Sequence, residues 1–407
     1  MYSEDTNTPK VSNYNKKLFW SYKRLDELKN TKKNENTIAN TIKNTIKNTF
    51  TNILNTKKKD KSDKLDKLDK INKKKNTKKV FHIINNKVVT NQNLIKRLDS
   101  IYVPPAYKNL IVAKKETNKV QVIGTDDKGR RQYIYHTNYT KKRNSRKYDD
   151  VMELGKCIIK IEKDNNTMIN ELSKKKYKDW ILPDDYIPII VYMLRTYNFR
   201  IGNECYANDN DSYGITTLKK NHIHFLEKDN KNNFKIEFVG KKGIINTYTD
   251  DSNNHKISNI LKMLINNASR DGYLFKYENN DKHYFITPDQ IQIFFQDKYN
   301  AYITPKMFRT WYGNFHMINY LNKLFKEHKL KQSMLKSEIK ELISNCSKHV
   351  SSKLNNTPSI SKKSYIDNKI LDLVIKNPYK FASSIPNNID EQHKFLYKTI
   401  MKLRNLQ

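Results

Sequence analysis

The sequence lacks the features that mark secreted, membrane-spanning or disulfide-bonded proteins. Its 407 residues include three cysteines, Cys157, Cys205 and Cys346, whose spacing indicates neither a disulfide framework nor a zinc site. No apolar run approaches the roughly 18 residues of a transmembrane helix. The N-terminus also lacks the apolar core of a signal peptide. These absences predict an intracellular protein without a membrane partner.

Two signatures of nucleic-acid enzymes are missing as well. The chain contains no Walker A motif, which argues against ATP-driven strand passage. It also shows no clustered carboxylates for catalytic metal ions, which disfavours a metal-dependent nuclease. We therefore expect no cofactor and no metal site.

Positive charge is abundant. The chain has 78 Lys+Arg against 42 Asp+Glu, a formal net charge of +36. Residues 1–80 contain 22 basic and 9 acidic residues, a net of +13, which leaves +23 to residues 81–407. The excess charge therefore belongs to the folded part too, and it favours a polyanionic partner such as nucleic acid.

The patterns divide the chain into three parts. Residues 1–79 form a Lys/Asn-rich leader, expected to be flexible or partly helical, with apolar residues at helical spacing within 37–54. Residues 80–145 contain short strand-like runs separated by turn residues and predict a small β-rich domain. Residues 146–407 look mainly α-helical, with a helix start at Asp149-Asp150, a strand insertion within 223–248 and helices through most of the remainder. The fold class is thus α+β.

Four separated elements have residues suited to phosphate chemistry. Arg200 follows a strongly apolar helix, Lys241 lies in a glycine-bounded turn between two strands, and Lys306 precedes Arg309 by three residues. Tyr365 lies near the C-terminus. Each element alone is weak, because solvated surface arginines and buried core tyrosines are common. Their order is more informative.

In this order the chain resembles the type IB DNA topoisomerases, especially the poxvirus-like branch. The resemblance spans residues 80–385 and includes GTDDKGRRQYIYH (124–136), FRIGNECY (199–206), SYGITTLKKNHI (212–223), FVGKKGIINTY (238–248), MFRTWYG (307–313) and NTPSISKKSYI (356–366). It implies a β-rich N-terminal domain and a larger helical catalytic domain that close as a C-shaped, monomeric clamp around double-stranded DNA. It also implies action in a virion or at a viral replication site if the source is a virus.

The resemblance implies a role for each of these residues in relaxing supercoiled DNA without ATP. Tyr365 would form a 3′-phosphotyrosyl ester, which stores the energy of the broken phosphodiester. Arg200 and Arg309 would clamp the phosphate, since guanidinium groups match its geometry and stay charged. Lys241 would protonate the departing 5′ oxygen, with Lys242 as its rival and Lys306 as a further candidate. Asn356 departs from the family, because many relatives have His there, yet its amide can still donate.

DNA recognition is expected from the small domain and from the segment after Arg200. Gln132 could pair with adenine in the major groove. Tyrosine hydroxyls can reach phosphates or base edges, so Tyr133, Tyr135 and Tyr206 are candidates for DNA contacts. The alternative for Tyr133 and Tyr135 is one face of a strand packed on a core.

Two other functions are alternatives for a chain with these residues. A tyrosine recombinase has the same nucleophile and arginine pair, but usually His-x-x-Arg at the second arginine, whereas this chain has Lys306-Met307-Phe308-Arg309. It also lacks the GRRQYxY element. A non-catalytic DNA-binding protein is disfavoured because usable residues occupy all the main catalytic positions.

Overall fold

The computed structural model describes residues 18–26, 80–226, 232–250 and 254–404. They belong to two compact units that divide between Arg143 and Asn144, close to the boundary expected after residue 145. The helix expected within 37–54 lies outside the described residues.

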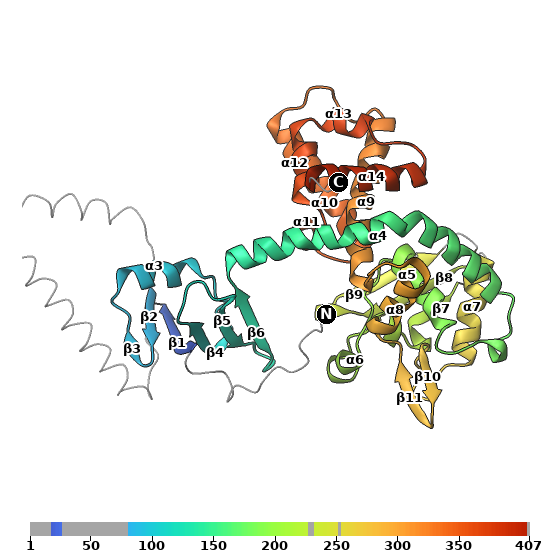
Figure 1. Cartoon of the computed structure of the whole chain (residues 1–407), viewed down its shortest axis with the longest axis horizontal. Helices are drawn as coiled ribbons and strands as arrows, with labels where there is room; N and C mark the ends of the chain where they lie inside the picture. Colours follow the sequence, from blue (N-terminus) through green and yellow to red (C-terminus); the bar gives the residue numbers. More distant parts are fainter. Residues whose placement is uncertain (1–17, 27–79, 227–231, 251–253, 405–407) are drawn as a thin grey trace, which may run out of the picture. The chain divides into compact units, whose positions relative to one another are not determined.

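The smaller unit is built on one antiparallel sheet (Figure 1). Its strands lie in the order β3-β2-β1-β4-β5-β6. Their bounds are β1 Phe19–Asp26, β2 Val80–Ile84, β3 Lys87–Val88, β4 Lys108–Ala113, β5 Val120–Thr125 and β6 Arg131–Tyr135.

Strand β1 corrects the expectation that the folded part begins at residue 80. It pairs with β2 through Tyr22↔Ile84 and with β4 through Trp20↔Val112, so a segment of the presumed leader lies within the sheet. Trp20 and Tyr22 alternate toward the core, and Tyr22 is buried there. This short alternation is easily overlooked beside so many Lys and Asn residues.

Helix α3, Gln92–Ser100, is joined to the sheet by a buried histidine. Atom Nδ1 of His82 on β2 lies 2.9 Å from the Tyr22 hydroxyl, and Nε2 lies 2.8 Å from Asp99 Oδ1 on α3. Leu98 of the same helix is buried against Val112 and Val122. Apolar burial and a satisfied polar chain therefore fix this unit's core together.

The larger unit is mainly helical. Helix α4, Thr137–Leu172, crosses the division between the units. The other helices are α5 Tyr186–Thr196, α6 Glu204–Asn210, α7 His255–Asn266, α8 Pro288–Tyr299, α9 Pro305–Lys326, α10 Lys336–Leu354, α11 Pro358–Ser364, α12 Asn368–Lys376, α13 Pro378–Ser383 and α14 Ile389–Arg404. A three-stranded sheet contains β7 Ile223–Phe225, β8 Phe234–Val239 and β9 Ile245–Asp250, as the strand pattern predicted.

Two expectations for this part of the chain are wrong. Helix α4 begins at Thr137 and not after Asp149-Asp150. Most of its residues from 141 to 147 are exposed, so no apolar stripe marks that segment as helical. The stretch expected to be helical after 258 also includes a hairpin of β10 Lys276–Asn279 and β11 Lys282–Phe285. Asn280 and Asp281 form its turn with positive φ, a conformation that these residues tolerate.

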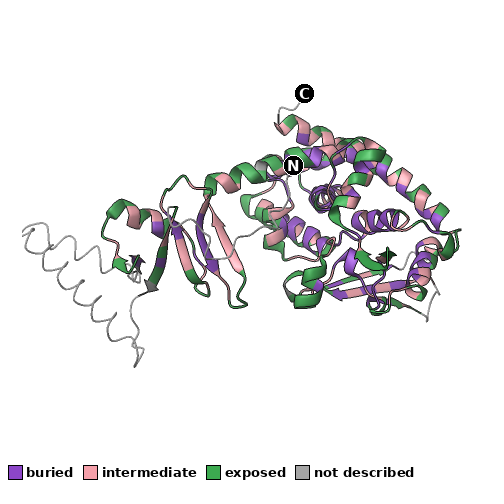
Figure 2. Ribbon diagram, turned by 60° about the horizontal axis from the view of Figure 1, so that its bottom comes forward, coloured by how far each residue is buried: buried purple, intermediate pink, exposed green. Residues whose placement is uncertain are grey.

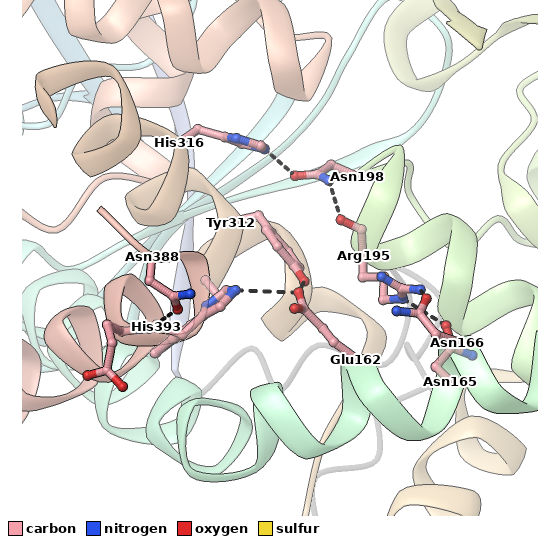
Figure 3. A network of polar contacts seen from close by, with 11 residues as sticks. Glu162, Asn165, Asn166, Arg195, Asn198, Tyr312, His316, Asn388 and His393 are labelled. Atoms are coloured by element: carbon pink, nitrogen blue, oxygen red, sulfur yellow. Dashed lines mark hydrogen bonds and ion pairs between the residues drawn. The ribbon is translucent and has the colours of Figure 1, made fainter. Parts of the chain in front are cut away.

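Helix α9 runs through the core of the larger unit, and fourteen of its 22 residues are buried. In Figure 2 the buried residues lie on the inner sides of the helices and the exposed residues face outward. A polar network holds α9 to its neighbours (Figure 3): Glu162 of α4 accepts a hydrogen bond from Tyr312 and lies 3.4 Å from His393 Nε2 of α14. Because α9 is fixed from several sides, the side chains on its first turns have defined positions.

Candidate active site

Tyr365 lies at the end of α11, against α9. Thr357 caps the start of α11 by accepting from the Ile360 amide, and Pro358 occupies the first turn. Asn314 Nδ2 of α9 donates to the Tyr365 carbonyl at 3.0 Å. A Cβ on Gly313 would lie 2.9 Å from the Tyr365 Cβ, so glycine permits this close approach of the two backbones. The tyrosine backbone is thereby fixed in place.

Arg309 is buried beside Tyr365, with 3% of its surface exposed. Its Nη2 donates to the Leu354 carbonyl at 2.7 Å, and its Nη1 donates to the Asn198 carbonyl. Its Nε lies 3.4 Å from the Tyr365 hydroxyl. A guanidinium has five N–H donors, so these bonds leave donors for a phosphate oxygen.

The Asn198 carbonyl that accepts from Arg309 has a fixed position, because hydrogen bonds of the Asn198 side chain hold this residue in place. Asn198 adopts a φ of 55°, its Oδ1 lies 2.9 Å from His316 Nε2, and its Nδ2 donates to the Arg195 carbonyl (Figure 3). The neutral form of His316 suits this buried position, because burial lowers its pKa to about 3. The loop that ends α5 is thus fixed before it reaches Arg200.

Arg200 and Asn356 contact each other near Tyr365 and Arg309. Arg200 Nη2 donates to Asn356 Oδ1 at 2.7 Å. The Asn356 Nδ2 group is buried and has no hydrogen-bond partner among the described residues. The backbone of Arg200 is held by the Ile215 amide, which donates to its carbonyl at 2.9 Å. A buried donor without a partner is costly, so this amide is suited to an anionic ligand.

The surrounding charges alter the pKa of Tyr365. Burial alone would raise it, but the positive charges of Arg309, Arg200 and Lys147 and the Arg309 hydrogen bond outweigh burial and lower the pKa to about 8. Burial and repulsion from Arg200 lower the pKa of Arg309 to about 10, against the opposing effect of Tyr365. Arg309 therefore stays charged at neutral pH, and Tyr365 ionises more easily than an ordinary tyrosine.

Sequence reasoning missed Lys147, which belongs to α4. It donates to the Ser364 carbonyl, and its Nζ lies 5.4 Å from the centre of the Tyr365 ring. Several lysines and arginines precede it in a run of exposed residues, so no sequence signal distinguished it from them.

The structure does not join the predicted lysines to this cluster by any described bond. Lys241 begins the short 3-10 turn η5, Lys241–Gly243, at the tip of the β8–β9 hairpin, as the sequence predicted, and its side chain is exposed. The Lys242 side chain lies outside the described residues. Lys306 is exposed on the first turn of α9. Within the described part of the chain, neither Lys241 nor Lys306 forms a hydrogen bond or ion pair with Tyr365, Arg309 or Arg200.

The four predicted DNA-contact residues lie on two elements. Tyr133 and Tyr135 are half-buried on one face of β6, with ring centres 6.4 Å apart. Gln132 donates to Asp126 Oδ2 at 2.9 Å, and Asp126 also holds Arg130. Tyr206 on α6 is 60% exposed. Tyr133 and Tyr135 are thus neither fully buried nor fully exposed.

Neither a metal cluster nor a membrane span is present in the described ranges. Among residues 18–26, 80–226, 232–250 and 254–404, no group of three His, Cys, Asp or Glu side chains could hold a metal ion. In those same ranges no helix is both long and apolar enough to cross a membrane.

Comparison with known proteins connects this geometry to a family. Residues 136–383 match the family described as eukaryotic DNA topoisomerase I, catalytic core, and residues 80–126 match the N-terminal domain of bacterial DNA topoisomerase IB. Both matches lie within the span of the sequence resemblance.

Individual relatives agree. The chain is 30% identical to DNA topoisomerase 1B of Acanthamoeba polyphaga mimivirus over 329 residues, which cover 80% of this chain and 91% of the relative. It is 27% identical to DNA topoisomerase 1 of rabbit fibroma virus, over 68% of this chain and 80% of the relative. It is 26% identical to DNA topoisomerase 1B of vaccinia virus, over 62% of this chain and 71% of the relative. The chain belongs to the type IB DNA topoisomerase family.

Proposed function

We propose that Tyr365 is the nucleophile with which this type IB DNA topoisomerase cuts one strand of supercoiled duplex DNA. Its phenolic oxygen attacks a backbone phosphate, a 3′-phosphotyrosyl bond forms, and the 5′ oxygen of the next nucleotide leaves. The free strand rotates and the 5′-OH then attacks the phosphotyrosine, restoring both the DNA and Tyr365. The observation that supports this most is the buried Arg309 beside a tyrosine whose pKa is lowered to about 8.

Arg309, Arg200 and Asn356 are proposed to hold the phosphate. The two guanidinium groups neutralise charge that spreads over the nonbridging oxygens in the transition state. Asn356 Nδ2, buried without a partner among the described residues, donates to one of those oxygens while Asn356 Oδ1 orients Arg200. The amide thereby takes the place of the histidine that many relatives have.

Lys241 is proposed as the general acid that protonates the departing 5′ oxygen. An alkoxide is a very poor leaving group, so the step needs a positioned proton. The exposed tip of the β8–β9 hairpin is a place where DNA can reach the lysine. Lys306 is the next candidate, since it lies one turn before Arg309 on α9.

The DNA partner is proposed to be a duplex enclosed by a single chain, with the two units closing as a C-shaped clamp. Gln132, Tyr133, Tyr135 and Tyr206 contact bases or phosphates in this arrangement. The net charge of +36 supports binding to a polyanion. The three relatives named above come from viruses, which supports action in a virion or at a viral replication site.

One assay tests the function directly. The chain should relax both positively and negatively supercoiled plasmid with EDTA present and ATP absent, and Tyr365→Phe should bind DNA but relax none. A trapped adduct should map to Tyr365 and to a 3′ DNA end. An adduct on another tyrosine, or on a 5′ end, would contradict the proposal. Strand exchange between two sites instead of relaxation would favour a tyrosine recombinase.

A further inference from the structure

A lysine outside the predicted catalytic residues contacts the peptide that holds Tyr365. Lys147 belongs to α4, whereas Tyr365 ends α11, and more than 200 residues separate them in the chain. The Lys147 ammonium donates to the Ser364 carbonyl and lies 5.4 Å from the centre of the Tyr365 ring. It also lies 4.8 Å from the centre of the Tyr148 ring, and Tyr148 is buried. Lys147 is half-buried, and its ammonium lies near both aromatic rings.

This contact stabilises a specific feature of α11. Ser364 is the last residue of that helix, and a carbonyl at a helix C-terminus has no partner within the helix. A cation at this end satisfies the carbonyl and interacts favourably with the negative end of the helix dipole. Lys147 thus fixes the point at which the chain leaves α11 and turns toward Tyr365.

A second helix holds the next carbonyl. Asn314 Nδ2 of α9 donates to the Tyr365 carbonyl at 3.0 Å, and Asn314 Oδ1 accepts from the Asp367 amide at 2.8 Å. Two consecutive carbonyls, those of residues 364 and 365, are thus held from two different helices. Together with the Tyr365 amide, which donates to the Ser361 carbonyl at 2.9 Å, these two contacts fix the backbone from which the Tyr365 side chain extends.

We propose that Lys147 is a positioning residue for Tyr365, which fixes the nucleophile by holding the Ser364 carbonyl while its charge faces the phenol ring. The inference rests on the proposed role of Tyr365 as the nucleophile. Reactions of this kind depend steeply on placement, and a displacement of about 1 Å can cost on the order of 10²-fold in rate. Losing the contact should therefore affect the chemical step and not the affinity for DNA.

The test is the single-turnover cleavage rate of Lys147→Met at saturating DNA, with the dissociation constant measured separately. We expect cleavage to slow by roughly tenfold or more, with affinity close to wild type. Lys147→Arg, which can still donate to the carbonyl, should recover most of the rate. Lys160→Met is the matched control: Lys160 lies on the same helix, and its Nζ is 5.7 Å from the ring centre of Tyr299. This variant should cleave normally.

The outcomes separate this inference from the proposed function. Wild-type cleavage by Lys147→Met, or a defect that disappears when DNA is raised, would overturn the positioning role, and the latter would indicate a phosphate contact instead. If Lys147→Met does not fold, as judged by its thermal midpoint, Lys147→Ala, which likewise has no donor for the carbonyl, is expected to show the same slow cleavage. An active Tyr365→Phe would overturn both proposals, whereas an inactive Tyr365→Phe beside a normal Lys147→Met would overturn only this one.

Discussion

The charged group beside Tyr365 is buried and hydrogen-bonded, whereas the charged group at the tip of the β8–β9 hairpin is exposed. Arg309 is buried, and two backbone carbonyls and a tyrosine hydroxyl hold its guanidinium. Lys241 is exposed in a short turn between Gly240 and Gly243. The first arrangement is complete before DNA arrives, whereas the second has a lysine that no described bond holds.

The difference matches the work proposed for each region. Stabilising a charged transition state is most effective when the donors are already oriented, because no reorganisation is then needed during the reaction. A proton donor must instead approach an oxygen that belongs to the substrate, and its contact need only form in the complex. We infer that the arginine cluster is preorganised and that the lysine is positioned by bound DNA.

The largest expected effect tests the hairpin lysine. Lys241→Ala should slow cleavage of ordinary DNA by about 10²- to 10⁴-fold, as for a lost general acid. A substrate with sulfur at the 5′ bridging position has a leaving group whose pKa is near that of a thiol, so it needs no proton. Cleavage of that substrate should recover towards the wild-type rate. The measurement is the single-turnover rate on both substrates.

Lys242 and Lys306 are the other two candidates for the general acid, and the same two substrates distinguish them from Lys241. Lys242→Ala should behave almost normally on both substrates. Rescue of Lys242→Ala by sulfur without rescue of Lys241→Ala would show that the other lysine of the turn is the acid. Rescue of neither variant would point to Lys306. Arg309→Ala should recover much less, since its role is at the nonbridging oxygens.

The two arginine variants should slow the reaction alike but differ in stability. Arg309→Lys and Arg200→Lys should each slow cleavage and religation on the order of 10²-fold, because each loses paired donation to the phosphate. Only Arg309→Lys should also lower the thermal midpoint, since lysine cannot reach the Asn198 and Leu354 carbonyls with the same fork of donors. Equal midpoints for the two variants would contradict the distinction between a buried and a half-buried arginine.

A smaller effect is expected at Asn356. Asn356→Asp keeps the size of the side chain and the acceptor for Arg200, but it removes the buried Nδ2 donor and adds a negative charge. Cleavage should slow by about tenfold or more, because a donor to the developing charge is lost and the new carboxylate repels the phosphate. Asn356→His restores a donor and should cleave faster than Asn356→Asp. Similar rates for the two variants would remove Asn356 from the phosphate site.

The smallest effect is the ionisation of one phenol in the DNA-free enzyme. With the Tyr365 pKa lowered to about 8, the ultraviolet difference between wild type and Tyr365→Phe should show one phenolate appearing as pH rises through about 8. The folded pKa is below the ordinary value of about 10, so the associated stability is fully present above 10 and is lost as pH falls through 8. A phenolate that appears only near pH 10 or above would show that burial offsets the positive charges around Tyr365.

Much of this site could be predicted because its residues lie in long sequence motifs. Arg200, Arg309, Asn356 and Tyr365 were all named from the sequence, and the structure brings them together. Their contacts could not be predicted, because they depend on how α5, α9, α10 and α11 pack. The sequence showed that Asn356 stands where many relatives have histidine. It did not show that Arg200 donates to Asn356 Oδ1, or that Asn356 Nδ2 has no partner among the described residues.

The fold shows the same division between pattern and context. The strands within 80–135 and the hairpin of β8 and β9 were predicted from alternation and turn residues. Helix α4 was predicted to begin too late because its exposed first turns have no apolar face to reveal them. Lys147 lies in that same stretch, so nothing in the sequence could assign it to the end of α11.

Strand β1 has a consequence for how the chain folds during synthesis. Among the strands that the structure describes it is synthesised before its partners β2 and β4, which follow only after residues 27–79 have been made. Pairings so distant in sequence raise the contact order and are slow to form. An unpaired strand is also open to other chains while it waits. Strand β1 can therefore complete its pairing only after residue 113 has emerged.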